Sequence, residues 1–156
     1  MQFWKKVLFC VLAVELLGNA SGLVTALSMD GWYAALEKPP GTPPDGVFGP
    51  VWFVVYALMG VGLALIWHEP AETRVKRRAL RWFGLQFGLN LLWTPVFFGL
   101  QRIELAFGII VLLLLFIGLT IRATRAISRP AAGLFLPYLA WVGYATYLNL
   151  GFLLLN

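Results

Sequence analysis

Amide and aromatic side chains recur at helical spacing in the segment 82–100. Spacings of four, three and four residues place side chains in one stripe of an α-helix, here Gln86, Asn90, Trp93 and Phe97. An amide in an apolar helix is costly unless it finds a hydrogen-bond partner. Aromatic faces beside an amide suit a flat ligand with a polar edge, so Asn90 and Trp93 are candidate ligand contacts.

Two further segments carry the same combination. Near the C-terminus, spacings of three, four and four align two aromatic residues, one small residue and one amide, namely Tyr138, Trp141, Ala145 and Asn149. Trp52 and Tyr56 also share one helical face. Aromatic residues commonly pack between helices or form belts at membrane interfaces. A shared aromatic pocket and ordinary packing therefore both remain open.

Signals for catalysis or metal binding are weak. His68 is the only histidine and stands at the end of an apolar segment, where a solvated side chain is the simplest interpretation. Cys10 is the only cysteine, so an internal disulfide and a cysteine-based metal site are excluded. No cluster has metal-ligand spacing, and no nucleophile–base pair for hydrolysis is evident. We expect no metal site and no required cofactor.

Glu15 and Asn19 are four residues apart in another apolar segment. An ionisable residue within a membrane span is a functional candidate by default. We favour a buried structural contact over a proton relay. The nearby small residues would let a second helix approach closely; they are Gly18, Ser21, Gly22 and Thr25.

The elements that must position these residues are five apolar stretches, at about 7–27, 47–67, 82–100, 104–121 and 132–154. A hydrocarbon core about 30 Å thick needs about 20 helical residues to cross it, and lipid forces the backbone to pair internally. Hydrophobic residues make up 60% of the chain and charged residues 12%, against about 25% charged in soluble domains. The sequence predicts an all-α fold, a five-transmembrane-helix membrane bundle in which residues 1–156 form a single domain.

Basic residues mark one side of the predicted membrane. Ten of the 12 Lys and Arg residues precede the first span or lie in the connections 68–81 and 122–131, and only Lys38 and Arg102 lie on the other side. Short loops rich in Lys and Arg stay cytoplasmic, so we expect a cytoplasmic N-terminus. The pI near 9.7 is then explained by basic residues that lie beside anionic lipid headgroups on the cytoplasmic side. No nucleic-acid partner is expected.

The connection 28–46 between the first two spans is rich in aromatic residues and proline. Pro39 should end a short helix that carries Trp32 and Tyr33. The next three prolines then hold the chain extended; they are Pro40, Pro43 and Pro44. Two interpretations are equally open. The connection is either an interfacial aromatic belt or a lid over a cavity in the bundle.

Gly84 and Gly88 form a Gly-x-x-x-Gly pair on the side of the third span away from Asn90. Such a pair permits close helix approach. It predicts a packing face, either within the bundle or between two copies in a homodimer.

Several motifs occur in one order along the chain. They are Trp-Tyr-Ala-Ala-Leu-Glu-Lys-Pro at 32–39, Thr-Pro-Pro at 42–44, Val-Trp at 51–52, Asn-Leu-Leu-Trp-Thr-Pro-Val-Phe-Phe-Gly at 90–99, Leu-Pro-Tyr-Leu-Ala-Trp at 136–141 and Ala-Thr-Tyr-Leu-Asn at 145–149. Together they resemble the tryptophan-rich sensory protein family, also called the translocator protein or peripheral-type benzodiazepine receptor family. The resemblance covers nearly the whole chain.

This resemblance implies a five-helix, usually dimeric bundle with a cavity that opens toward the first loop. It implies binding of tetrapyrroles such as protoporphyrin IX, and of synthetic benzodiazepine-type or isoquinoline-carboxamide ligands. The family's pocket falls on Tyr33, Trp52, Asn90, Trp93, Trp141, Ala145 and Asn149. Because helical spacing assigns most of these residues to inward faces, we expect Trp52, Asn90 and Trp141 to converge on one chamber.

Three functions follow as hypotheses. The favoured one is a porphyrin-binding sensor or translocator protein. The resemblance also implies an enzyme alternative, light- and oxygen-dependent degradation of protoporphyrin IX, with Trp52 and Trp141 as candidate catalytic residues. Transport by alternating access is disfavoured, because the sequence shows no internal repeat and an odd number of spans.

One departure from the animal relatives concerns cholesterol. Their proposed motif requires a basic residue after a tyrosine, but no basic residue follows Tyr144 or Tyr147. Specific cholesterol recognition at that site is therefore not expected. The charge bias favours a bacterial inner membrane, with the mitochondrial outer membrane of eukaryotic relatives as the alternative.

Overall fold

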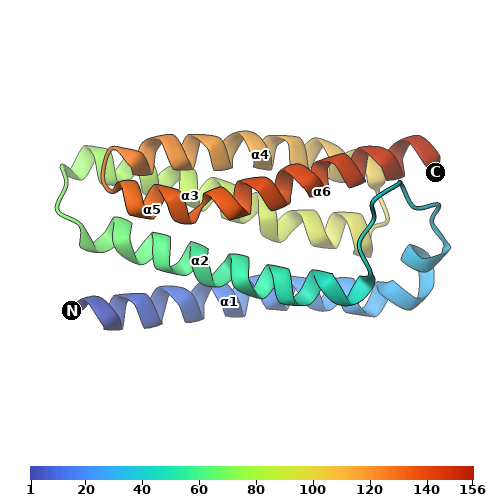
Figure 1. The fold of residues 1–156 in the computed structure, drawn as a ribbon, viewed down its shortest axis with the longest axis horizontal. Helices are drawn as coiled ribbons and strands as arrows, with labels where there is room; N and C mark the ends of the chain where they lie inside the picture. Colours follow the sequence, from blue (N-terminus) through green and yellow to red (C-terminus); the bar gives the residue numbers. More distant parts are fainter.

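The computed structural model describes residues 1–156 as a bundle of helices without strands (Figure 1). Its five long helices are α1 (Phe3–Ser28), α2 (Phe48–His68), α3 (Thr73–Thr94), α4 (Ile103–Arg125) and α6 (Leu136–Leu155). A short helix, α5 (Arg129–Leu134), leads into α6. The prediction of an all-α fold is confirmed.

Four helical stretches are long and apolar enough to cross a membrane: α1 with its continuation to Tyr33, α2 with the turn before it, α4, and α5 together with α6. The third predicted span differs. Arg77, Arg78 and Arg81 fall in every 18-residue stretch of α3, so this helix is too strongly charged to count among the candidate membrane spans.

The segment 68–81 is also not the loop that the sequence predicted. Helix α3 begins at Thr73, so most of this basic segment forms its first turns. Arginine and lysine are good helix formers, and neither glycine nor proline interrupts the chain between Thr73 and Phe83. The change in hydropathy near Trp82 therefore lies inside a continuous helix.

Two helices end in single π-helical turns at the same end of the bundle. Helix α1 continues into Met29–Tyr33, and α3 continues into Pro95–Gly99. Proline has no amide hydrogen to donate to the preceding turn, which accounts for the change of helical form at Pro95. These turns bring Tyr33 and Phe98 together, with ring centroids 5.4 Å apart.

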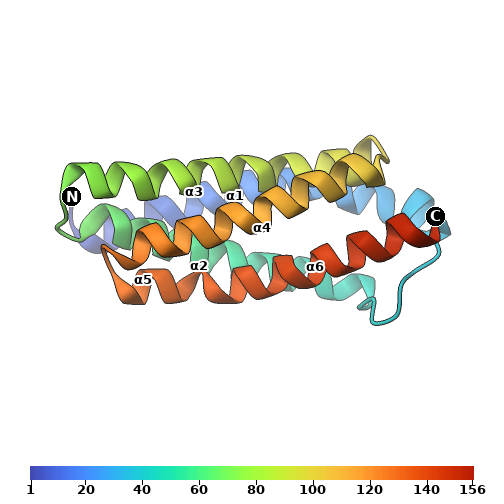
Figure 2. The same cartoon turned by 90° about the horizontal axis from the view of Figure 1, so that it is seen from above.

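Neighbouring helices close into a ring in the order α1, α2, α5–α6, α4, α3, seen from two directions in Figures 1 and 2. Hydroxyl groups tie α1 to α3, where Ser21 Oγ donates to the Leu91 carbonyl at 2.9 Å and Ser28 Oγ donates to the Phe98 carbonyl at 3.1 Å. The three basic regions lie at the end that holds the N-terminus.

The connection after Tyr33 crosses the opposite end of the bundle, reaches the last turns of α6 and returns to α2 (Figure 1). The Tyr147 hydroxyl donates to the Pro40 carbonyl at 2.8 Å, and the Tyr144 hydroxyl donates to the Gly41 carbonyl. Pro39 is buried against Gly151. These contacts hold the connection on α6.

Candidate ligand-binding site

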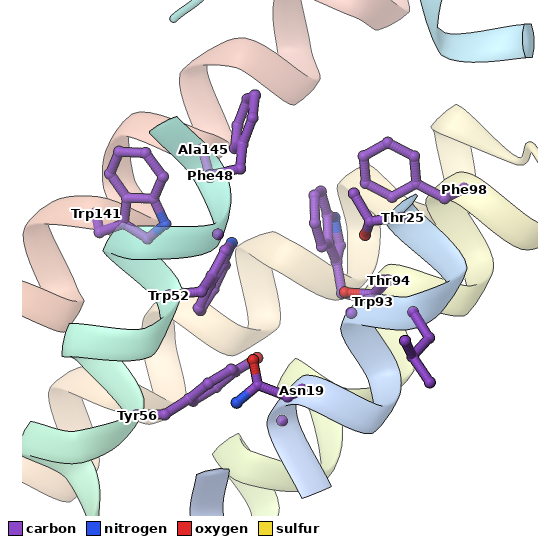
Figure 3. Close-up of a pocket in the computed structure, with 14 residues that line it drawn as sticks. Asn19, Thr25, Phe48, Trp52, Tyr56, Trp93, Thr94, Phe98, Trp141 and Ala145 are labelled. Carbon is purple, nitrogen blue, oxygen red and sulfur yellow. The ribbon is translucent and has the colours of Figure 1, made fainter. Parts of the chain in front are cut away.

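A cavity of about 290 Å³ lies inside the bundle, toward the end covered by this connection (Figure 3). Its aromatic lining residues are Phe48, Trp52, Tyr56, Trp93, Phe98 and Trp141. The remaining wall consists of small, polar and aliphatic residues, which are Gly18, Asn19, Gly22, Leu23, Thr25, Gly49, Thr94 and Ala145. The wall is therefore mainly apolar, with few hydrogen-bonding groups.

Aromatic rings from α2 and α6 form one corner of this cavity. Trp52 stacks on Tyr56, with ring centroids 5.3 Å apart and an interplanar angle of 27°. Trp141 stands edge-on to Trp52, at 6.4 Å and 84°. Offset stacks and edge-on pairs are the favoured arrangements of aromatic rings. Tyr56 reaches its position because Gly18 has no side chain, since a Cβ there would overlap the Tyr56 ring.

The indole N–H groups in this wall differ in their partners. Trp93 Nε1 donates to Asn149 Oδ1 at 3.0 Å. Trp141 Nε1 is buried and has no partner, and Figure 3 shows it on the side of the ring that faces Trp52. A buried donor without an acceptor is rare and destabilising. Trp141 Nε1 is therefore a candidate hydrogen-bond donor to a ligand that reaches the edge of this ring.

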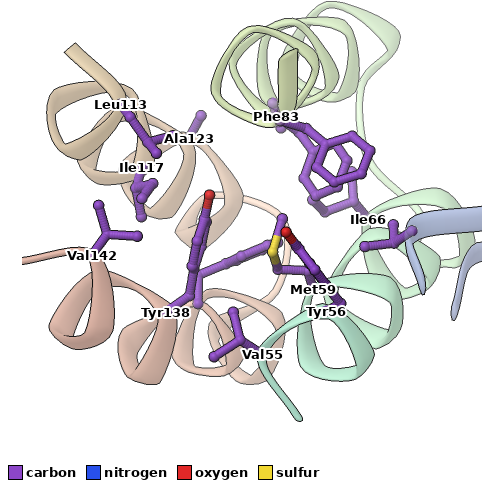
Figure 4. Close-up of a cluster of buried hydrophobic side chains, with 14 of the residues drawn as sticks. Val55, Tyr56, Met59, Ile66, Phe83, Leu113, Ile117, Ala123, Tyr138 and Val142 are labelled. Atoms are coloured by element: carbon purple, nitrogen blue, oxygen red, sulfur yellow. The ribbon is translucent and has the colours of Figure 1, made fainter. Parts of the chain in front are cut away.

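Asn90 lies one layer behind the cavity wall. It is 3% exposed, and its neighbours Tyr56 and Tyr138 belong to the apolar cluster shown in Figure 4. The Tyr56 hydroxyl donates to Asn90 Oδ1 and Asn90 Nδ2 donates to the Tyr138 hydroxyl, both at 3.0 Å. The Tyr138 hydroxyl donates to Gln86 Oε1 at 2.8 Å. The buried amide thus has protein partners, and it holds Tyr56 from behind.

The structure separates the seven predicted ligand residues into three groups. Trp52, Trp93, Trp141 and Ala145 line the main cavity. Tyr33 and Asn149 line a small adjoining pocket of about 30 Å³ beneath the connection, which shares Trp93 and Ala145 with the main cavity. Asn90 lines neither. The two indoles converge as the sequence predicts, while Asn90 reaches the cavity only through Tyr56.

Helix α1 contributes wall residues that the sequence assigned to helix packing. Gly18 does pack closely, against Tyr56, but a Cβ at Gly22 would meet no atom within 4 Å. Asn19 and Thr25 line the cavity as well. Small residues one turn apart are the only sequence signal for this wall, and the same signal is typical of tight helix packing.

Gly84 and Gly88 face away from the bundle. Both are exposed, and a Cβ at either position would meet no atom within 4 Å. Close packing of these glycines inside the bundle is thereby ruled out. The exposed leucines Leu85 and Leu92 extend the same outer surface of α3.

The chain has relatives that match nearly all of its length. The sequence model of the TspO/MBR family matches residues 10–155. The chain is 40% identical over 153 residues to the tryptophan-rich protein TspO of Archaeoglobus fulgidus, covering 97% of both chains. It is 36% identical over 130 residues to the tryptophan-rich sensory protein of Cereibacter sphaeroides, covering 83% of this chain and 80% of the relative. It is 40% identical over 121 residues to the translocator protein of Ovis aries, covering 76% and 70%.

Proposed function

The chain belongs to the TspO/MBR family of membrane proteins, and we propose that it binds a porphyrin-type tetrapyrrole in the cavity between its helices. The observation that carries this proposal is the aromatic corner of Trp52, Tyr56 and Trp141, together with the unpaired indole N–H of Trp141. A flat macrocycle presents apolar faces to the rings and carboxyl oxygens at its edge. Its burial would contribute about 25 cal/mol per Å² before ordering costs.

The size of the cavity sets a condition on this binding. A volume of about 290 Å³ lies at the lower end of the range for small-molecule sites, which is about 300–1,000 Å³. A tetrapyrrole with its substituents is larger than this cavity. Part of the macrocycle must therefore extend through an opening, or the connection over Pro39 and Pro40 must lift from α6.

A titration in lipid nanodiscs tests the proposal. Protoporphyrin IX should quench the tryptophan fluorescence of the protein saturably at micromolar concentration. Ala145→Leu should abolish saturation because its side chain fills the cavity. Ala140→Leu is the matched control, since Ala140 lies on the outer surface of the same helix. Absence of saturable quenching by the wild-type protein would refute the proposal.

Benzodiazepine-type and isoquinoline-carboxamide ligands should compete for the same site. Their fused aromatic rings match the aromatic corner, and their carbonyl oxygens can accept the hydrogen bond from Trp141 Nε1, which has no other partner. Displacement of bound porphyrin by such a ligand would support a shared cavity. Simultaneous binding of both would place the second ligand elsewhere.

A second candidate function is the light- and oxygen-dependent degradation of protoporphyrin IX. The observation that favours it is the contact of oxidisable rings at one place, with Trp52 between Tyr56 and Trp141. Illumination under dioxygen should then give a defined product that is lost in Trp52→Phe or Trp141→Phe. Equal, unspecific bleaching by both variants would exclude this function.

We also propose that α3 is the fifth membrane span. Residues 82–100 form a helical segment about 28 Å long, close to the thickness of a hydrocarbon core of about 30 Å. The arginines before Trp82 would then lie among lipid headgroups. The excess of basic residues at that end favours a cytoplasmic N-terminus, and a bacterial inner membrane is the location we propose.

The outward Gly84–Gly88 surface is the contact we propose for a homodimer. Two helices approach closely where such small residues meet, and no other part of the bundle occupies this surface. Cholesterol is not among the partners we propose. The hydroxyls of Tyr144 and Tyr147 are engaged by backbone carbonyls of the connection, and no basic residue follows them.

A further inference from the structure

The walls of the cavity are not equally closed. Only three of its lining residues are exposed, and all three belong to α1 or α2; they are Asn19, Leu23 and Gly49. The lining residues from α3, its π-helical turn and α6 are buried or half-buried. The cavity therefore communicates with the surroundings on the side between α1 and α2.

The packing of α1 on α2 explains this opening. The two helices are in close contact where Gly60 lies against Val11 and Gly18 lies against Tyr56, so that a Cβ on either glycine would overlap its neighbour. One turn further along α1, at Gly22, and near the start of α2, at Gly49, an added Cβ would meet no atom within 4 Å. Figure 3 shows α1 and α2 on opposite sides of the cavity. The helices touch below the cavity and separate beside it.

Asn19 lies at the lower edge of this opening. Its Nδ2 donates to the Glu15 carbonyl at 2.8 Å and to Glu15 Oε2 at 2.7 Å. Both amide hydrogens are thereby used, which leaves Oδ1 as an acceptor. Asn19 is about 24 Å along the helix from Phe3, so it lies at membrane depth, where an unpaired polar atom is costly. Asn19 Oδ1 can therefore accept a hydrogen bond from a donor on a molecule in the opening.

We infer that ligands enter and leave the cavity sideways from the bilayer, through the opening between α1 and α2, and that Asn19 accepts a hydrogen bond from the ligand there. This inference rests on the proposed binding of a porphyrin-type ligand. The ligand class is a flat molecule that partitions into lipid and carries an O–H or N–H donor at its edge, such as a protonated carboxyl group. Glu15 is a positioning residue, because it fixes which atom Asn19 presents.

Exchange kinetics in nanodiscs test the route. Protoporphyrin IX is loaded into the lipid, and its association and dissociation are followed by quenching of tryptophan fluorescence. Gly22→Leu should slow association about tenfold, which is an added barrier of about 1.4 kcal/mol. Gly108→Leu on α4 is the matched control, because a Cβ there also meets no atom within 4 Å, and it should leave both rates unchanged.

A variant of the connection tests the competing route from water. Tyr147→Phe removes the hydrogen bond to Pro40 and should leave the exchange rates unchanged. Faster exchange in Tyr147→Phe, with wild-type rates in Gly22→Leu, would place the entrance under the connection and overturn the inference. Faster dissociation with unchanged association in Gly22→Leu would mean that Gly22 contacts the bound ligand without lying on its route, and would overturn the inference as well.

Paired ligands test the role of Asn19. Asn19→Leu should weaken binding of the free acid of protoporphyrin IX about fivefold, the effect of one hydrogen bond worth about 1 kcal/mol, and should leave binding of its dimethyl ester unchanged. Glu15→Leu should act like Asn19→Leu, whereas Glu15→Gln keeps an acceptor for Asn19 and should restore wild-type binding of the acid.

An equal effect of Asn19→Leu on acid and ester, or no effect on either, would refute this contact. The two proposals fail separately. Wild-type protein that does not bind porphyrin in the same nanodiscs refutes both, whereas normal equilibrium binding with rates that do not respond to Gly22→Leu refutes the lateral route alone.

Discussion

Replacing Asn90 by leucine should destabilise the fold more than it weakens ligand binding. Asn90 is almost completely buried and joins the hydroxyls of Tyr56 and Tyr138. Leucine has a similar volume but neither donates nor accepts a hydrogen bond. The Tyr56 hydroxyl would lose its acceptor, whereas the Tyr138 hydroxyl would still donate to Gln86. One buried donor is therefore orphaned, and one further hydrogen bond is lost.

These two losses set the expected magnitude. An orphaned buried hydroxyl costs about 1–3 kcal/mol, and an ordinary hydrogen bond contributes about 1 kcal/mol. We expect Asn90→Leu to lower the free energy of unfolding by about 2–4 kcal/mol. Tyr56→Phe removes the orphaned hydroxyl, so the double variant should be more stable than the sum of the single effects by about 1–2 kcal/mol.

Reversible unfolding in mixed micelles measures this cycle, and porphyrin titration of the folded protein measures binding. The affinity of folded Asn90→Leu should stay within about threefold of wild type, because Asn90 acts through the position of Tyr56. Unchanged stability together with a tenfold loss of affinity would refute this reasoning. That result would show that Asn90 contacts the ligand directly. Strict additivity in the cycle would show that the Tyr56–Asn90 hydrogen bond contributes nothing.

Three other substitutions separate packing, assembly and recognition. Gly18→Leu should lower the thermal unfolding midpoint because its side chain overlaps the Tyr56 ring; a wild-type midpoint would contradict this packing of α1 on α2. Gly88→Leu should reduce the dimeric fraction in sedimentation experiments without changing porphyrin affinity, and Gly108→Leu should change neither; equal dimeric fractions in both variants would exclude the α3 contact. Trp141→Phe should weaken porphyrin binding about fivefold, because it removes a hydrogen bond worth about 1 kcal/mol; unchanged affinity would mean that its indole N–H does not bind the ligand.

The helices were predictable because lipid leaves the backbone few alternatives. A long apolar stretch in a bilayer must pair its amides within a helix, so hydropathy located α1, α2, α4 and α6 to within a few residues. Hydropathy did not locate the start of α3. The arginines after Thr73 end the apolar stretch but remain good helix formers. Hydropathy reports where an apolar stretch ends, which differs from where a helix ends.

The aromatic part of the site was also predictable, but the α1 wall was not. Trp52, Trp141 and Ala145 lie on inward faces that helical periodicity identifies, and they line the cavity. Gly18 and Gly22 carry the same sequence signal, yet one touches α2 and the other borders empty space. Only the angle between two helices distinguishes them. That angle depends on contacts such as Gly60 against Val11, which are far away in sequence.

The amides show most clearly what a sequence leaves undecided in a membrane protein. Burial requires a partner for each amide, but the partner can be the protein or a ligand. The structure gives Asn90 two tyrosine hydroxyls and gives Asn149 the Trp93 indole and a backbone carbonyl. Because those groups satisfy one another, ligand recognition must depend on groups that remain unpaired at the cavity, which include a donor at Trp141 and an acceptor at Asn19. They lie on α6 and α1, at the inner wall and at the opening, so a ligand that satisfies both must extend from the aromatic corner toward the lipid.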